Sequence, residues 1–184
     1  MQLIRTILRA LQAISAIIVL AISIDLARGQ NTTLQPVPAA TGYAAFCGGL
    51  RIVTAIVGIA SLFVSSLQGV ITLALDVLTA AAMVAGGIAY AVLLRHTTCS
   101  DVQSSRVTQT NVLLSGGCTE MFDDDDHLWC RYAGDANVGT LKSRCHSARA
   151  DSAFMFIGCL ACLGVVAWSF FKRGSAGKGG VSYA

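Results

Sequence analysis

The sequence predicts an all-helical membrane protein in which four transmembrane helices form a bundle. Hydrophobic residues make up 54% of the 184 residues and charged residues only 12%, about half the charged share of ordinary soluble domains. The charges are also unevenly placed, because residues 52–94 contain a single charged side chain, Asp76. With a net charge of +3, this composition excludes a disordered chain and a basic nucleic-acid-binding protein. We therefore expect lipid, and no nucleic acid, as a partner.

Four apolar segments are long enough to cross a hydrocarbon core about 30 Å thick. They comprise residues 10–27, 44–65, 71–94 and 152–171. Backbone inside lipid must satisfy its own hydrogen bonds, so each segment is expected to be a helix. The short connector between the second and third segments predicts a helical hairpin. The membrane domain would then occupy residues 1–171, and the glycine-rich residues 172–184 would form a flexible tail.

The distribution of lysine and arginine predicts that both termini are cytoplasmic. Arg5 and Arg9 precede the first segment and the C-terminal tail is purely basic, whereas the loop 95–151 contains more acidic than basic residues. This bias follows the positive-inside rule and makes the loop 95–151 exofacial. We expect the first segment to be retained as a helix rather than cleaved as a signal peptide, because no small-residue cleavage site precedes Asp25. On this topology Asn31, in an N-x-T sequon, is a candidate glycosylation site.

Four of the seven cysteines lie in the exofacial loop, namely Cys99, Cys118, Cys130 and Cys145. An even number of exofacial thiols predicts two disulfides, for which three pairings are open. We favour Cys99–Cys145 with Cys118–Cys130 nested inside it, because Cys99 and Cys145 adjoin span ends that should lie close together. Four free thiols and a tetrahedral zinc site are the alternatives, but zinc is disfavoured because the loop has no C-x2-C pair.

The remaining cysteines, Cys47, Cys159 and Cys162, lie within spans. Cys159 and Cys162 form a C-x-x-C sequence, but the helical rise places them about 12 and 16 Å beyond Asp151. A thiolate at that depth is poorly solvated. We therefore interpret these cysteines as small residues on a packing face.

Two ionisable residues, Arg51 and Asp76, lie inside the spans and are functional candidates by default. Counting the helical rise leaves more than about 10 Å between their levels, which argues against a direct ion pair. We expect Arg51 to extend toward the outer surface. Asp76 is expected to be a polar clamp that is hydrogen-bonded by threonines of its own helix or faces Ser61 or Ser65. A proton or substrate relay and lipid headgroup contact remain as alternatives.

Small and polar residues recur at helical spacing on the second and third segments and predict the face on which these helices pack. They include Thr54, Gly58 and Ser61 on the second segment and Thr79 and Gly86 on the third. We expect no catalytic residue, no cofactor and no metal site. The acidic run Asp123–Asp126 lacks the glycine and spaced ligands of a calcium loop, so we interpret it as a solvated turn.

Three features carry a resemblance to a known family. They are Asp76 in the third span, Cys99 just past that span, and Cys145 before the alanine-rich opening of the fourth. With these features the chain resembles the fungal MARVEL-domain proteins, and among them the non-classical export protein 2 family, over residues 4–171. The resemblance implies a tetraspan bundle with cytosolic termini that organises membrane domains or trafficking at the plasma membrane or on vesicles. The longer third loop and Arg51 depart from the family pattern.

The leading functional hypothesis is a non-enzymatic membrane-organising protein whose partners are membrane lipids, further copies of itself, or other membrane proteins. A small transporter or channel subunit is the alternative, although the sequence lacks the broken helices and inverted repeats typical of transport sites. A thiol redox enzyme that resembles vitamin K epoxide reductase and uses Cys159 and Cys162 is a third hypothesis. It is disfavoured because the cysteine-bearing loop precedes the fourth span instead of following the first.

Overall fold

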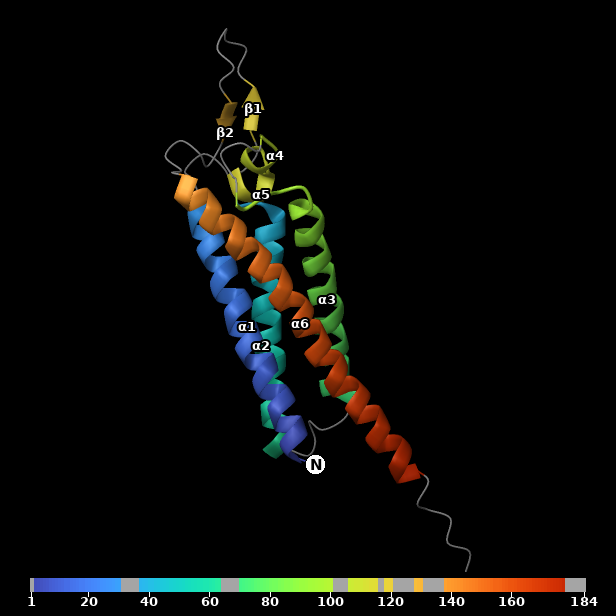
Figure 1. The fold of residues 1–184 in the computed structure, drawn as a ribbon. Helices are drawn as coiled ribbons and strands as arrows, with labels where there is room; N and C mark the ends of the chain where they lie inside the picture. The colour runs from blue at the N-terminus through green and yellow to red at the C-terminus, as the bar shows by residue number, and fades with distance from the viewer. Residues whose placement is uncertain are drawn as a thin grey trace, which may run out of the picture.

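Four long helices dominate the computed structural model, which describes residues 2–30, 37–63, 70–100, 106–115, 118–120, 128–130 and 138–177. They are α1 (Gln2–Gln30), α2 (Ala39–Phe63), α3 (Val70–Leu94) and α6 (Val138–Gly177) (Figure 1). Each contains a stretch that is long and apolar enough to cross a membrane. The prediction of a four-span helical membrane protein is therefore confirmed.

The helices extend beyond the apolar segments that predicted them. α1 begins at Gln2 rather than at residue 10, and α6 begins at Val138 rather than at residue 152. Part of the expected loop 95–151 is therefore helix, and α6 continues to Gly177, into the segment expected to be a flexible tail. The physical reason is that each residue added to an existing helix gains a backbone hydrogen bond whether or not its side chain is apolar.

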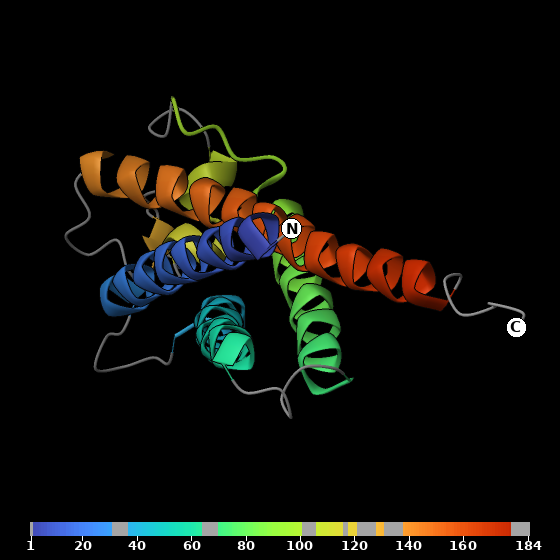
Figure 2. The same cartoon turned by 90° about the horizontal axis from the view of Figure 1, so that it is seen from below.

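The long helices form a ring in which α1 packs against α2 and α6, and α3 packs against the same two helices. Consequently α1 and α3 lie diagonally opposite each other across the core, as the end-on view shows (Figure 2). The start of α1 and the end of α6 lie at the same end of the bundle (Figure 1). The segment between α3 and α6 covers the opposite end.

This covering segment, which we call the cap, contains four short elements. They are α4 (Arg106–Gln109), α5 (Val112–Ser115), β1 (Cys118–Glu120) and β2 (Leu128–Cys130). The two strands pair antiparallel, so the cap adds a small hairpin to an otherwise helical fold. Gln30 Nε2 at the end of α1 donates a hydrogen bond to the Leu113 carbonyl, and Asn111 Nδ2 donates to the Leu93 carbonyl of α3. The cap is thus attached to the helices that it covers.

The bundle buries charged side chains and exposes large apolar side chains, which is the opposite of the arrangement in a soluble protein. Exposed apolar residues on the four long helices include Ile14, Ile17, Phe46, Ile56, Leu78, Val92, Leu160 and Leu163. In contrast, Arg9, Arg51, Asp76 and Asp151 are all buried. This arrangement suits a bundle whose exterior contacts lipid, where an exposed charge would be penalised.

Candidate functional site

Buried polar side chains occupy three successive layers along the bundle. We call them the terminal layer, near the start of α1; the middle layer; and the cap-side layer, beneath the cap. The terminal layer contains Arg9, Gln12 and Asp76, the middle layer Arg51, Thr54 and Thr79, and the cap-side layer Ser23, Thr41, Tyr90 and Asp151. We take this polar core as the candidate functional site, since ionisable groups inside a membrane protein mark function more often than other residues do.

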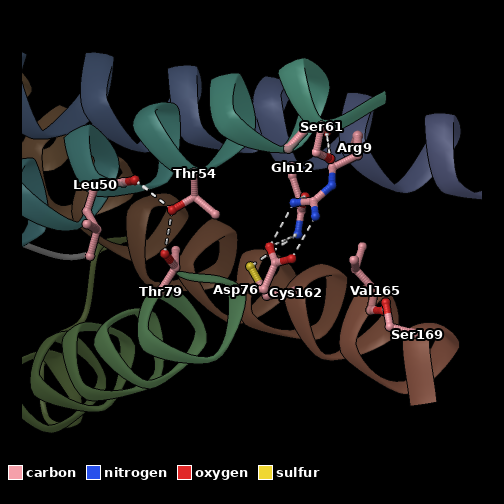
Figure 3. A network of polar contacts seen from close by, with 11 residues as sticks. Arg9, Gln12, Leu50, Thr54, Ser61, Asp76, Thr79, Cys162, Val165 and Ser169 are labelled. Carbon is pink, nitrogen blue, oxygen red and sulfur yellow. Dashed lines mark hydrogen bonds and ion pairs between the residues drawn. The ribbon is translucent and has the colours of Figure 1, made fainter. Parts of the chain in front are cut away.

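The terminal layer is built around an ion pair between Arg9 of α1 and Asp76 of α3. Arg9 Nη1 lies 2.8 Å from Asp76 Oδ1, and Arg9 Nη2 lies 2.7 Å from Asp76 Oδ2 (Figure 3). This two-pronged geometry is the strongest form of guanidinium–carboxylate contact. Gln12 supports both partners, because its Oε1 accepts from Arg9 and its Nε2 donates to Asp76.

The two other long helices complete the terminal layer. Gln12 Nε2 also lies 3.3 Å from the Sγ atom of Cys162 on α6. On α2, a Cβ atom added to Gly58 would come within 2.6 Å of the Arg9 guanidinium carbon. The missing side chain at Gly58 therefore leaves the space in which the guanidinium lies.

The structure corrects the expected surroundings of Asp76. Among the described residues its interhelical partners are Arg9 and Gln12 of α1, rather than Ser61 of α2. Ser61 Oγ instead donates to the carbonyl of Gly58 on its own helix, and Ser65 lies outside the described residues. Asp76 therefore connects α3 to α1, whereas the sequence predicted a contact with the second segment.

The sequence contained a signal for this pairing. Arg9 was assigned to the cytoplasmic flank because apolarity begins at residue 10. However, polar residues recur along α1 at intervals close to one or two helical turns, in Arg9, Gln12, Ser15 and Ser23. All four are buried, and such a stripe marks an inward face.

The middle layer contains Arg51, whose side chain is only 1% exposed. Its Nε atom donates to the Gln12 carbonyl at 3.1 Å, whereas Nη1 and Nη2 have no hydrogen-bond partner in the described part of the chain. The expectation that Arg51 extends to the outer surface is therefore wrong. The guanidinium lies against α6, where a Cβ atom on Gly158 would overlap Nη1. Within its described part the structure gives no ion pair between Arg51 and Asp76. This agrees with the separation between their levels that the helical rise predicted.

The stripes predicted on the second and third segments do face each other. Thr54 Oγ1 of α2 and Thr79 Oγ1 of α3 lie 2.8 Å apart (Figure 3). Gly58, Ser61 and Gly86 of the same stripes are also buried. Hydrogen bonds and small side chains thus join these helices, as is usual for helix pairs in lipid.

The cap-side layer brings together one side chain from each long helix. Ser23 Oγ of α1 donates to Asp151 Oδ2 of α6 at 2.9 Å. Asp151 Oδ1, the Thr41 hydroxyl of α2 and the Tyr90 hydroxyl of α3 have no partner at hydrogen-bond distance and angle among the described residues. Sequence reasoning missed this layer because it placed Asp151 at the end of an exofacial loop.

The four cysteines at the cap end of the bundle occupy two sites. Cys99 and Cys145 form a disulfide with a Cα–Cα distance of 5.6 Å, which ties the segment after α3 to α6. The Cα atoms of Cys118 and Cys130 face each other in the hairpin register, while their side chains lie outside the described part of the structure. Asn31 and Asp123–Asp126 also lie outside the described residues.

The cysteines of the spans are free thiols. Cys47, Cys159 and Cys162 are all buried, and Cys162 serves as an acceptor for Gln12. Within the described ranges, no three His, Cys, Asp or Glu side chains gather into a metal-binding group. The geometry thus assigns these thiols contacts between helices.

A buried polar core inside four apolar helices defines an integral membrane protein of the tetraspan class. The MARVEL family model, described as a membrane-associating domain, matches residues 2–168. The chain therefore belongs to the MARVEL family, as its resemblance predicted. No curated protein and no solved structure matches the sequence.

Proposed function

We propose that this protein is a non-enzymatic organiser of membrane domains and trafficking, located in the plasma membrane or in secretory-pathway vesicles with both termini cytoplasmic. Asp76, Cys99 and Cys145 fit the pattern of the fungal non-classical export protein 2 family, which supports this role within the wider MARVEL family. The observation that carries the proposal is the inverted polarity of the bundle, with buried charges and an apolar exterior.

The proposed mechanism is lateral. The Arg9–Asp76 pair and the Thr54–Thr79 contact hold the helices in one arrangement, so the exterior is a fixed apolar surface. Such a surface selects neighbouring lipids and membrane proteins by shape and packing, because the hydrophobic effect does not drive association inside lipid. Membrane lipids, further copies of the chain and other membrane proteins are the partners that this surface fits.

α6 contributes a distinct part of that surface. It extends beyond the other long helices at the end where α1 begins (Figure 1). Leu160, Leu163, Phe170 and Phe171 are exposed along it. A helix that projects from the bundle with exposed aromatic residues can contact lipid and neighbouring proteins outside the packed core.

Reconstitution into giant vesicles that separate into ordered and disordered lipid phases tests the proposal. An organiser should concentrate in one phase or form clusters, and replacing Leu160 and Leu163 by alanine should change that distribution without altering the unfolding temperature. The matched control replaces Ser143 and His146, which are exposed on α6 before its apolar stretch, by alanine and should leave the distribution unchanged. Uniform, unclustered protein in both phases would contradict the proposal.

A small transporter or channel subunit is the second candidate, and the stacking of three polar layers along the bundle favours it. Its test is ion flux through liposomes that contain the full chain. Flux that is lost in an Asp76→Asn variant still folded at the assay temperature would support transport, whereas liposomes as tight as protein-free ones would favour the organiser.

A further inference from the structure

We propose that the cap-side layer is a binding site for one small monovalent cation, such as Na⁺ or K⁺, held by Ser23, Thr41, Tyr90 and Asp151. The proposal does not depend on the proposed function, because a bound ion can stabilise an organiser or a transporter alike.

The first argument is the number of unpartnered atoms in one place. Thr41, Tyr90 and Asp151 are each 0% exposed. Among the described residues, Thr41 Oγ1, Tyr90 OH and Asp151 Oδ1 have no partner at hydrogen-bond distance and angle, although the Tyr90 and Thr41 hydroxyls lie near each other. Buried polar atoms are nearly always paired in native proteins, so each exception calls for an explanation. Here three exceptions occur in a single layer.

The second argument is that these oxygens converge. Ser23 and Asp151 are in direct contact, with 2.9 Å between Oγ and Oδ2. Ser152, next to Asp151, donates from Oγ to the Gly87 carbonyl of α3 at 3.1 Å, which places α3 against α6 about one turn before Tyr90. Tyr90 in turn lies close to Thr41. Oxygens from all four long helices thus lie at one level of the core.

The third argument is charge. The one ion pair in the described residues joins Arg9 to Asp76, in the terminal layer. Arg149, the basic residue nearest to Asp151 along α6, is exposed and donates to the Thr97 carbonyl. The Asp151 carboxylate is therefore buried without a cationic partner, a state that an ionised group rarely keeps.

The chemistry of the oxygens selects the ligand. One carboxylate, two aliphatic hydroxyls and one phenol form an all-oxygen donor set, which suits hard cations. A single carboxylate balances a single positive charge, whereas Ca²⁺ sites usually combine several acidic groups. The layer lies close to the cap, because Thr41 is in the first turn of α2 and Tyr90 is about one turn before the end of α3. An ion would therefore enter from the cap side.

Thermal unfolding of the full chain in lipid nanodiscs tests the proposal. The midpoint is measured in NaCl, KCl and N-methyl-D-glucamine chloride at equal ionic strength and pH. A ligand that binds only the folded state raises the midpoint with its concentration. We expect a rise of several degrees between about 1 and 100 mM of the bound ion, and none in glucamine. Calorimetric titration with the same ion should show saturable binding of one ion per chain.

Two variants locate the site. Asp151→Asn should abolish the cation-dependent shift, and Tyr90→Phe should weaken it severalfold. The matched control, Asp25→Asn, removes an exposed carboxylate from α1 and should leave the shift unchanged. If Asp151→Asn does not fold, the Tyr90→Phe variant and the comparison of salts with the wild-type protein still test whether the cation binds in this layer. Equal midpoints in all three salts would overturn the proposal, as would a stabilisation that depends on pH but not on the cation.

Discussion

Arg9 and Asp76 form a two-pronged ion pair across the diagonal of the bundle, between two helices that do not pack as neighbours. Both side chains are buried, so neither charge is hydrated. A buried ion pair of this kind adds little net stability, but removing either partner leaves the other charge buried and unpaired, which is strongly destabilising. The pair therefore holds α1 and α3 at one relative height.

We expect Asp76→Asn to destabilise the protein. The substitution leaves the buried Arg9 charge without its carboxylate, and breaking one side of a buried pair costs about 3–5 kcal/mol. The unfolding midpoint in nanodiscs measures the loss. Replacing both partners, in Arg9→Met with Asp76→Leu, should restore much of it, because no unpaired charge remains. If Asp76→Asn alone were as stable as the wild type, the pair would not hold the bundle.

Gly158→Ala should destabilise the middle layer, because the added methyl group would overlap Arg51 Nη1. Forcing extra volume into a packed core typically costs about 1–3 kcal/mol. Gly49→Ala on α2 is the matched control, since a Cβ atom there meets nothing within 4 Å. It should be neutral or stabilising, because alanine favours helix over glycine by about 1 kcal/mol. Unfolding midpoints measured side by side should fall for Gly158→Ala and should stay level or rise for Gly49→Ala.

Cys145→Ser should leave Cys99 as a new free thiol, because the two residues are joined in the structure. Differential alkylation of the denatured protein, followed by mass spectrometry, identifies the freed residue. In the chain-entropy model, closure of a loop with a sequence separation of 46 residues stabilises the protein by about 4 kcal/mol. Detection of Cys118 or Cys130 as the new thiol instead would contradict the nested pairing.

Both termini are expected to face the cytoplasm and the cap to face the outside. An epitope tag after residue 184 should be stained only in permeabilised cells, whereas a tag inserted within residues 121–127 should be stained in intact cells. The physical reason is the excess of basic residues near the termini, which resist translocation. The reverse staining pattern would invert the topology and remove the oxidising environment on which the disulfide depends.

The sequence by itself determined the four helices, because a helix in lipid requires only length and local apolarity, both of which can be counted along the chain. It also predicted that the small polar stripes of the second and third segments face each other, because a short connector forces consecutive helices to pack together. The Thr54–Thr79 contact lies between these stripes. The pairing of Cys99 with Cys145 follows from the same kind of geometry, since both adjoin the same end of the bundle.

Only the tertiary structure decided which charges meet. Arg9 precedes the apolar part of α1 and was assigned to the cytoplasmic flank, whereas the packed bundle brings it to Asp76 on the diagonal helix. Arg51 turns inward because Gly158, far away in the sequence, leaves space for its guanidinium. Asp151 is buried because α6 begins before its apolar stretch. Each outcome depends on the relative height and rotation of several helices, which local hydropathy does not encode.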